Sequence, residues 1–427
     1  MREMKDSGNM WIGATLETWK MIPLKYLASY NDEVLSENTD DEFEFDYIEI
    51  GSVQYGRGII YTEHMKFKNA PSRARRIVRK DDIIVSTVRT YLKAVATIPA
   101  CNNSLIASTG FIVIRPHKVL PRFMNYALLS EPFISLVESH STGISYPAIN
   151  SVDVVKFKIP VPCRSEQERI AAFLDAECAE IDAVLEKTRA SIEEYKKLKQ
   201  AVITQAVTKG VRGDRPMKDS GIEWIGDIPA EWSVVRIKNL FDYRNERNFR
   251  PLDEVNLISL YTDKGVVQHC DLEETTGNKA SNADGYKLVY ENDIVVNIIL
   301  CWMGAIGRSA YCGVTSPAYD VYSPKQGINS KFYHYLFRTN GFSGDCYKVG
   351  RGIMAMRWRT YSDQFRAIKV VFPSQSEQEE IIKYLDEKCA GLDALITKKQ
   401  QYLTEIENYK KSLIYEYVTG KKEVHPL

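Results

Sequence analysis

One stretch of 44 residues occurs twice in this chain, over 165–208 and over 376–419, and each copy reads as one long helix. The two copies are identical at 17 positions when they are superimposed without a gap. Each begins with Ser-Glu-Gln-Glu, so we expect Ser165 and Ser376 to cap the helices while the last glutamate bonds back to the cap residue. At about 1.5 Å per residue, each helix would be about 60 Å long.

Apolar residues follow the three-and-four spacing of a coiled coil along both copies. Neither apolar stripe is stable in water alone, so the simplest prediction is that the two helices bury each other. The residues expected to make this contact are Ile181, Leu185, Ile192, Tyr195, Leu198 and Val202 in the first copy, and Leu392, Ile396, Leu403, Ile406, Tyr409 and Leu413 in the second.

The rest of the chain repeats as well. The motifs Met-Lys-Asp-Ser-Gly and Trp-Ile-Gly occur near the start of the chain at 4–13 and again at 217–226, and we call each of these segments the lead of its repeat. The chain is therefore a tandem duplication with a period of 211 to 213 residues. The predicted domains are a first globular domain with its lead (1–163), a first spacer helix (164–212), a second globular domain (213–374) and a second spacer helix with a C-terminal tail (375–427).

Short strands dominate the two globular parts. Compact runs rich in β-branched residues at 82–85 and 293–296 predict strands of a mixed sheet, and shorter helices are expected at 122–129 and 331–338. The predicted fold class is therefore α+β, with two mixed α/β domains separated by two long antiparallel helices and an internal pseudo-two-fold repeat. Similar helices beside dissimilar globular parts suggest one scaffold with two specificities.

An antiparallel return of the second helix would bring its end at Gly420 beside Met4. The two globular domains would then be held at opposite ends of a rod, related by a pseudo-two-fold axis. Two readers of a split target need a stiff spacer of this kind, because a flexible linker would let the distance between them vary.

The charge of the chain neither favours nor excludes a nucleic-acid partner. Lys and Arg together number 56, and so do Asp and Glu, which gives a formal net charge of zero. A neutral chain can still gather its cations on one face. The sequence has no apolar run of about eighteen residues and no apolar signal-peptide core near its start, so a cytoplasmic protein is expected.

The paired helices, the Leu-Asp pairs at 174–175 and 385–386, the duplicated leads and the prolines at 160–162 and 373 resemble the specificity subunit of a type I restriction-modification enzyme. The resemblance covers essentially the full chain. It implies that each globular domain is a target recognition domain that reads one half of a bipartite site in double-stranded DNA.

The same resemblance implies partners. The helices would set the spacer between the two half-sites and dock two modification subunits, which would bind S-adenosylmethionine and methylate adenine. Restriction subunits, which supply the motor and the nuclease, would join them in the full complex. The chain itself is expected to have no cofactor and no catalytic activity. The first lead differs from the second at 9–10 and 14–16.

In the second domain, the segment 345–369 is basic and also contains Met and Trp. Arginine paired to guanine is the commonest specific contact in the major groove, and a Gly-flanked basic loop can approach a phosphate or a base edge closely. A solvated loop is the alternative interpretation. The DNA-binding candidates are Lys348, Arg351, Gly352, Met354, Arg357 and Trp358, with Asn297 and Trp302 from the turn after the apolar strand.

The equivalent segment of the first domain is polar, and it is placed by the match of Gly143-Ile144 with Gly352-Ile353. Hydroxyl groups bond base edges or phosphates. The basic run at 73–80 either contacts phosphates or pairs with the acidic run at 32–49. The candidates are Ser141, Thr142, Gly143, Ser145 and Tyr146, with Arg73, Arg75, Arg76 and Arg79 from the basic run and Arg89, Thr90 and Tyr91 from the next turn.

The sequence contains no phosphate-binding loop, no Rossmann glycine pattern and no Cys or His spacing suited to zinc. It also lacks the Asp/Asn-Pro-Pro-Tyr/Phe segment shared by amino-methyltransferases, so no catalytic or metal-binding residue is predicted. The competing hypothesis is an interaction scaffold whose coiled coil and globular ends bind proteins. Selection of a two-part motif from random duplex DNA would distinguish the two.

Overall fold

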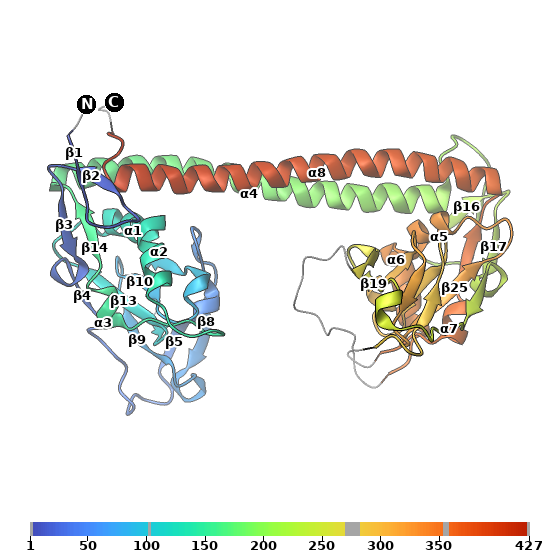
Figure 1. Cartoon of the computed structure of the whole chain (residues 1–427), viewed down its shortest axis with the longest axis horizontal. Coiled ribbons are helices and arrows are strands. Elements are labelled where there is room, and N and C mark those ends of the chain that lie inside the picture. Colours follow the sequence, from blue (N-terminus) through green and yellow to red (C-terminus); the bar gives the residue numbers. More distant parts are fainter. Residues whose placement is uncertain (1–2, 101–103, 270–281, 353–357, 425–427) are drawn as a thin grey trace. The chain divides into compact units, whose positions relative to one another are not determined.

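The computed structural model describes residues 3–100, 104–269, 282–352 and 358–424. The chain forms two compact units, the first made of Met1–Arg189 and Gln401–Leu427 and the second of Ala190–Gln400. Each unit therefore contains one globular part and segments of both long helices, α4 (Arg164–Lys209) and α8 (Gln375–Val418), which Figure 1 shows in green and red.

The first unit is built on two four-stranded sheets. One has the order β11 (Val95–Thr97), β10 (Ile83–Ser86), β13 (Phe111–Pro116), β4 (Ala28–Tyr30), and the other β8 (Glu63–Lys66), β5 (Glu44–Ile48), β12 (Leu105–Ser108), β9 (Ala74–Val78). Smaller pairs join β14 (Lys158–Val161) to β3 (Lys20–Pro23), β1 (Met4–Asp6) to β2 (Ala14–Leu16) and β6 (Val53–Gln54) to β7 (Gly58–Ile59). Its short helices are α1 (Pro121–Leu129), α2 (Glu131–Ser139) and α3 (Ser151–Val154). Since β12 runs parallel to β5 and antiparallel to β9, the second of these sheets is mixed, as expected.

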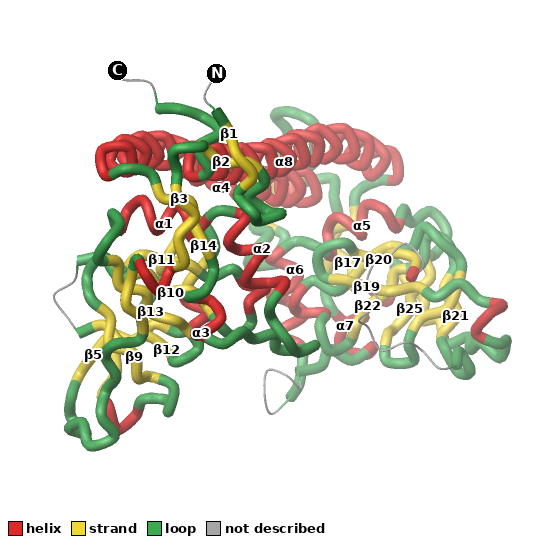
Figure 2. Tube along the Cα trace, turned by 60° about the vertical axis from the view of Figure 1, so that its left-hand side comes forward, coloured by secondary structure: helices red, strands yellow, loops and turns green. Residues whose placement is uncertain are grey.

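The second unit has one four-stranded sheet in the order β18 (Phe241–Arg244), β25 (Tyr319–Pro324), β22 (Ile294–Asn297), β23 (Ile306–Arg308). Two-stranded pairs join β17 (Ser233–Arg236) to β26 (Lys369–Phe372), β19 (Ile258–Tyr261) to β20 (Gly265–Gln268), β21 (Lys287–Val289) to β24 (Gly313–Thr315) and β15 (Met217–Asp219) to β16 (Asp227–Pro229). Its short helices are α5 (Ser330–Phe337), α6 (Asn340–Val349) and α7 (Ser362–Ala367). Figure 2 distinguishes these helices and strands by colour.

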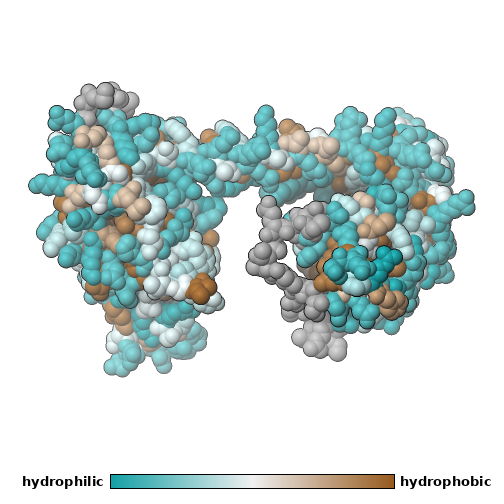
Figure 3. Space-filling view, viewed as in Figure 1, coloured by the Kyte–Doolittle hydropathy of each residue, from teal (hydrophilic) through white to brown (hydrophobic). Residues whose placement is uncertain are grey.

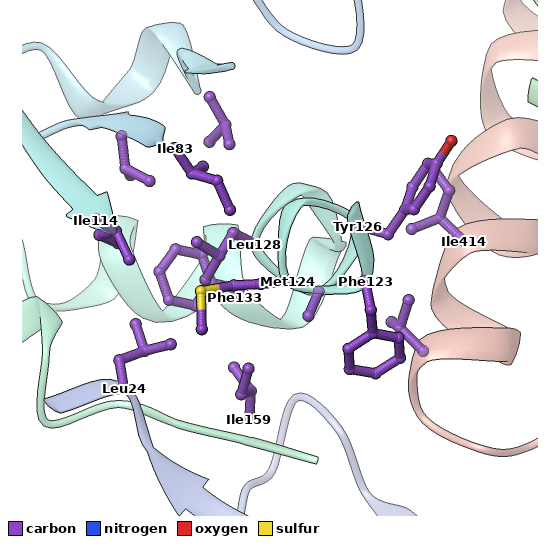
Figure 4. Close-up of a cluster of buried hydrophobic side chains, with 14 of the residues drawn as sticks. Leu24, Ile83, Ile114, Phe123, Met124, Tyr126, Leu128, Phe133, Ile159 and Ile414 are labelled. Carbon is purple, nitrogen blue, oxygen red and sulfur yellow. The ribbon is translucent and has the colours of Figure 1, made fainter. Parts of the chain in front are cut away.

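The core of the first unit includes the end of the other repeat's helix. Helix α1 lies between the sheet and α8, so that Leu128 points towards Ile83 on β10 while Tyr126 points towards Ile414 on α8 (Figure 4). Phe123 of α1 belongs to the same cluster. In the second unit the corresponding core includes apolar residues from the end of α4. Each globular part therefore completes its core with a helix end that belongs to the other repeat.

The two long helices pack antiparallel within each unit. Lys410 pairs with Asp182 at 2.7 Å in the first unit, and the equivalent Lys199 pairs with Asp393 at 2.6 Å in the second. Further contacts across the helix pair show the same direction, because the residue number on α8 decreases as the residue number on α4 increases. These contacts are Phe173–Tyr417 and Arg189–Glu407 in the first unit, and Tyr195–Lys399 in the second. Among the described residues, no helix has an apolar stretch long enough to cross a bilayer.

Most of the predicted stripe residues are shielded from solvent, but two are not. Ile181, Leu185, Ile192, Ile396 and Leu413 are buried, and Tyr195, Val202, Leu392, Leu403 and Ile406 are partly exposed. The prediction is wrong for Leu198 and Tyr409, which expose 48% and 56% of their surface. Leu198 lies six residues after Ile192, and Tyr409 lies six residues after Leu403, in each case as two steps of three residues. On a helix of 3.6 residues per turn, each step of three falls about 60° short of a full turn. Both side chains therefore rotate out of the stripe.

The capping-box prediction is also wrong, because α4 begins at Arg164 and α8 at Gln375, one residue ahead of each serine. Ser165 and Ser376 thus lie inside the helices. In α8 the hydroxyl of Ser374 accepts the backbone N–H of Glu377 at 3.4 Å. In the first copy the last glutamate of the word, Glu168, bonds Arg164 at 3.0 Å and does not reach back to the cap.

The middle residues of the Ser-Glu-Gln-Glu word hold the helix starts in place. Trp19 Nε1 donates to Glu166 at 3.0 Å, and Trp232 Nε1 donates to Glu377 at 2.7 Å. Both glutamines are buried. Gln378 donates to the carbonyl of Pro373 and accepts from the backbone of α5's cap residue, and Gln167 makes the matching bonds in the first unit. The repeated word therefore joins each long helix to its globular part.

The two leads pack differently. Trp224 donates to Asp345 at 2.6 Å and lies so close to Gly341 that a Cβ there would be 2.1 Å from its ring. Trp11 is the equivalent residue of the first unit and exposes 42% of its surface, while the neighbouring Met10 exposes 86%. The first lead therefore lacks the tight packing of the second.

Candidate nucleic-acid interface

A short hairpin loop in the first unit is closed by a β-bridge between Thr142 and Ala148, which exchange two backbone hydrogen bonds of 2.9 Å. Gly143 has a φ of +110°, a conformation that L side chains rarely adopt. A Cβ there would also lie 3.2 Å from the carbonyl oxygen of Tyr146. The tip of the loop faces solvent, since Ile144 is fully exposed and Tyr146 exposes 61% of its surface.

The turn that follows β10 packs against this hairpin. It contains a short 3-10 helix, Thr90–Leu92, preceded by Arg89 in a left-handed conformation with φ of 53°. The hydroxyl of Thr90 donates to the hydroxyl of Ser141 at 2.9 Å, and the guanidinium of Arg89 lies 5.1 Å from the ring centre of Tyr146. Two predicted segments some fifty residues apart in sequence thus form one surface.

The second unit repeats this frame. In the first unit the backbone N–H of Ile149 donates to the carbonyl of Thr87 at 2.9 Å. In the second unit the backbone N–H of Thr360 donates to the carbonyl of Ile298 at 2.8 Å, and each of these two residues lies 211 positions after its counterpart in the first unit. We name these the first turn–hairpin surface, residues 87–93 with 141–148, and the second turn–hairpin surface, residues 297–304 with the described part of 351–359.

Two arginines face each other across the base of the second hairpin. Arg351 and Arg359 exchange backbone hydrogen bonds of 2.9 Å, and both are exposed. Like charges directly opposite each other on paired strands are unfavourable, so this position favours a bound anion such as a phosphate. Arg359 is one of the cations of the basic segment 345–369 but is not among the DNA-binding candidates predicted from the sequence. The signal that could have selected it is its position 211 residues after Ala148.

Aromatic rings support the second hairpin. Tyr347 stacks on Trp358 with ring centres 4.9 Å apart and lies edge-on to Trp302 at 5.7 Å. The indole Nε1 of Trp358 donates to the carbonyl of Tyr347 at 3.1 Å. A Cβ on Gly350 would lie 2.3 Å from this nitrogen. Gly350 is therefore required by the packing of the tryptophan, and close approach of this loop to a phosphate or a base edge stays a prediction.

Two predicted contact residues are enclosed by the protein. Asn297 exposes 7% of its surface, and its side-chain oxygen accepts the backbone N–H groups of Ile299 and Leu300 at 3.0 and 3.3 Å. Thr90 exposes 2%. These two side chains shape the turns and are not placed to contact DNA directly, because their polar groups are buried and already bonded.

The remaining candidates of the second unit differ in their surroundings. Lys348 is exposed and pairs with Glu223 at 2.9 Å, so the pair holds the lead against α6. Gly352 is exposed at the start of the hairpin. Met354 and Arg357 lie outside the described residues.

The basic run of the first unit lies on β9 and is largely occupied within the protein. Arg79 pairs with Glu33 at 2.7 Å, as the alternative interpretation expected. The guanidinium of Arg75 lies 5.0 Å from the ring centre of Phe67. Burial lowers the pKa of the Arg76 guanidinium, because the charged form loses solvation there. These arginines contribute to the sheet and less to an open basic surface.

Arg73 differs from the rest of the run, because it adjoins the first turn–hairpin surface. Its carbonyl accepts the backbone N–H of Thr109 at 2.8 Å, and the next residue, Gly110, accepts from Thr87 in the turn at 2.8 Å. Arg73 itself is exposed. Ser145 and Tyr91 are exposed as well. The described part of the chain contains no group of three or more His, Cys, Asp and Glu residues arranged to hold a metal ion.

Comparison with known proteins identifies related chains. The model of the type I restriction modification DNA specificity domain matches this sequence twice, over 17–194 and 229–407. The chain is 24% identical over 434 residues to the MjaVIII specificity subunit of Methanocaldococcus jannaschii, covering 96% of this chain and 94% of that one. It is 25% identical over 339 residues to the EcoDI specificity subunit of Escherichia coli, covering 72% of each.

A solved structure shares the fold. It comes from a study described as the structural basis of complex assembly and conformational transition of the type I R-M system, and it matches with a TM-score of 0.71 and 18% identity. The match covers 96% of this chain and 99% of the other, so the likeness extends over both units.

Proposed function

Because the chain belongs to the family of type I restriction-modification DNA specificity subunits, we propose that its two turn–hairpin surfaces read the two halves of a split DNA target. One observation carries this assignment to particular residues. The backbone frame of the surface is the same in both units, held by equivalent hydrogen bonds, while the exposed side chains on it differ. A constant frame with variable side chains is what two readers of different sequences require.

The two surfaces offer different chemistry to DNA. The first presents hydroxyl groups, Tyr146 and the guanidinium of Arg89, which together suit base edges and nearby phosphates. The second presents Arg351 and Arg359 beside an aromatic stack. We therefore expect the second half-site to depend more strongly on arginine contacts, either to guanine or to the phosphates that flank it.

The long helices set the spacer between the half-sites in this proposal. Helix α4 runs unbroken for 46 residues and α8 for 44, and their antiparallel contacts are made within each unit. At about 1.5 Å per residue, each helix is close to 70 Å long. A helix of this length resists changes of distance far better than a flexible linker does.

The helices would also dock two modification subunits. Exposed apolar residues recur at equivalent positions of α4 and α8: Val184 and Leu395 expose 39% and 45%, and Leu198 and Tyr409 expose 48% and 56%. On the face seen in Figure 3 the helices are mostly hydrophilic, with separate apolar patches. The same apolar positions on both helices favour two copies of one partner.

A specificity subunit is the non-catalytic component of its complex. We therefore assign adenine methylation, together with the S-adenosylmethionine it consumes, to the modification subunits, and cleavage to the restriction subunits that join them. The chain would act in the cytoplasm. A purely protein-binding scaffold is the less favoured alternative, because the chain belongs to a DNA specificity family.

Mapping of methylated adenines in cells that carry this chain and its modification subunit tests the proposal. We expect one motif with two defined halves and a fixed gap. Arg351→Ala should relax or weaken the second half only, and Arg89→Ala the first half only. Arg79→Ala is the matched control, because Arg79 pairs with Glu33 away from the surface, and it should leave the motif unchanged. Equal loss of both halves in either surface variant would contradict the assignment.

A further inference from the structure

A pocket of about 500 Å³ opens in the first unit between α1, the β6–β7 hairpin and the two long helices. Its lining includes Gly56 on the hairpin, Thr97 on β11, Asn125 and Leu129 on α1, and Lys410 on α8. Sites that bind ligands or anchor side chains fall in this size range. The pocket shares Leu92 with the first turn–hairpin surface, but the rest of its lining lies outside that surface, so DNA reading does not account for it.

Two buried polar atoms in the pocket wall have no hydrogen-bond partner among the described residues. They are Oδ1 of Asn125 and Oγ1 of Thr97. Buried polar atoms are nearly always bonded in folded proteins, because an unbonded one loses its contacts with water and gains nothing in return. Both atoms can accept a hydrogen bond, so the pocket calls for a donor.

In the second unit the same place is filled by an arginine of the chain itself. Arg338 donates to the carbonyl of Ile306 at 3.0 Å, and to the carbonyls of Thr262 and Asp263 in the β19–β20 turn at 2.9 and 2.8 Å. The guanidinium thereby joins the hairpin to β23. Helix α1 of the first unit is equivalent to α5 of the second. Leu129 is the ninth residue from the start of α1, and Arg338 is the ninth residue from the start of α5, so Leu129 occupies the position of Arg338.

The neighbours of Arg338 match the pocket wall of the first unit. His334 stands where Asn125 stands, and Arg308 stands where Thr97 stands. His334 Nδ1 accepts the backbone N–H of Arg308 at 3.1 Å. The wall of the second unit is thus bonded internally around Arg338. The first unit has Leu129 at that position, and two acceptors of its wall have no partner among the described residues.

The cations at the rim of the pocket do not oppose a further positive charge, since each has a carboxylate partner. Lys410 pairs with Asp182 at 2.7 Å and Arg189 with Glu407 at 2.7 Å. The remaining pairs are Arg57–Glu186 at 2.9 Å and Lys411–Glu131 at 3.6 Å. The rim is therefore close to neutral, and the pocket opens beside both long helices.

We propose that this pocket receives the guanidinium group of an arginine from the protein that docks on the long helices. The first unit would obtain in trans the guanidinium that Arg338 supplies in cis to the second, while Lys410 already donates to the carbonyl of Gly56, the residue equivalent to Asp263, at 3.3 Å. The identity of the partner, a modification subunit, rests on the proposed function. The pocket then makes the docking of the two subunits unequal, because only the first unit offers an arginine site. Arginine anchored in a pocket is a frequent centre of binding energy in protein interfaces.

Leu129→Arg tests this inference by placing a guanidinium at the position of Arg338. Leu129→Met is the matched control, because it keeps an apolar side chain of similar size without donors. The purified chains are compared by thermal unfolding, and their complexes with the modification subunit by titration and by the mass of the assembly. We expect Leu129→Arg to melt no lower than Leu129→Met. We also expect it to bind one of two modification subunits at least tenfold more weakly, while the control assembles like the wild type.

Two results would overturn the inference while leaving DNA reading intact. Melting of Leu129→Arg well below Leu129→Met would show that the pocket does not accept a guanidinium. Normal melting with unchanged binding of both subunits would show that no partner arginine enters it. A wild-type chain that binds no modification subunit would instead contradict the docking part of the proposed function, and the inference with it.

Discussion

Histidine 334 illustrates how one substituted position gives the two units different responses to pH. It lies against Arg308 and Arg338, and burial, together with these two cations, lowers the pKa of its imidazole from 6.5 to about 3. The first unit has Asn125 at this position, which does not titrate. The histidine stays neutral in the folded chain at pH values where the unfolded chain binds a proton.

His334→Asn should therefore reduce the acid sensitivity of the chain. Because the pKa is lower in the folded state, the stabilisation is complete above about pH 6.5 and is lost as the pH falls towards 3. At about 1.4 kcal/mol per pH unit, the wild type should lose up to about 3 kcal/mol more than the variant between pH 6.5 and 4.5. Urea unfolding at these two pH values measures the difference. His117→Asn, on an exposed residue, is the control and should keep the wild-type slope.

Gly350→Ala should disturb the second turn–hairpin surface, since its Cβ would meet the indole of Trp358 at 2.3 Å. We expect at least fivefold weaker binding of a DNA probe that carries the methylated motif, with relaxed selectivity in the second half alone. Gly344→Ala is the matched control, because a Cβ there meets nothing within 4 Å and alanine favours the helix. Equal affinity of both variants would remove Trp358 from the reading surface.

At the scale of secondary-structure elements, the start of each long helix is a junction between helix and globular part. Glu377 exposes 1% of its side chain and pairs with Arg215 at 2.5 Å, while it accepts from Trp232 at 2.7 Å. This carboxylate connects the start of α8, the segment after α4 and the second lead. Its burial makes the pair sensitive to loss of either partner.

Glu377→Ala should lower the free energy of unfolding by about 1–3 kcal/mol, because the buried indole N–H of Trp232 would lose its acceptor and Arg215 would keep only Glu231 as a carboxylate partner. Glu379→Ala, two residues later on the exposed side of the same turn, should change it by less than about 0.5 kcal/mol. Calorimetry or chemical unfolding of the two variants measures the contrast. Similar stability of both variants would contradict the structural role given to the repeated word.

At the scale of the whole molecule, the two repeats depend on each other for their cores. The first unit uses the end of α8 and the second unit uses the end of α4. In the first unit, β2 is tied to the residue that follows α8, because the hydroxyl of Thr15 donates to the carbonyl of Thr419 at 2.9 Å. A change in length of one long helix alone would therefore displace a segment that the other repeat needs.

Insertion of seven residues into both α4 and α8, at equivalent positions, should lengthen the gap between the two half-sites. Seven residues add about 10 Å to each helix, which corresponds to about three base pairs. The methylated motif read from cells that carry the variant measures the gap, and both half-sites should keep their sequences. Insertion into α4 alone is the control and should abolish assembly. An unchanged gap after the double insertion would disprove the role of the helices as a spacer.

Much of the organisation follows from the sequence alone, because its signals are periodic and repeated. The spacing of apolar residues predicts the two long helices, and their duplication predicts two related units, since the same sequence in the same context folds in the same way. The expected shorter helices appear as α1 and α5. The Gly-Ile match also predicted which loops would be equivalent, and each of the two loops is closed by a backbone bridge, Thr142–Ala148 in the first unit and Arg351–Arg359 in the second.

Only the tertiary structure decided which of these residues are free to act. Sequence spacing carries no information about distant partners. It left open whether Arg79 contacts phosphate or pairs with the acidic run that contains Glu33, and it did not reveal that Asn297 is enclosed or that Leu198 turns away from the stripe. The pocket beside Asn125 could not be predicted for the same reason, because α1, the β6–β7 hairpin and the two long helices that line it are far apart in sequence. The local pattern of apolar residues determines the helices and strands and shows that they are repeated. Contacts between segments far apart in sequence determine which side chains are exposed, which charged groups are paired and where a pocket remains.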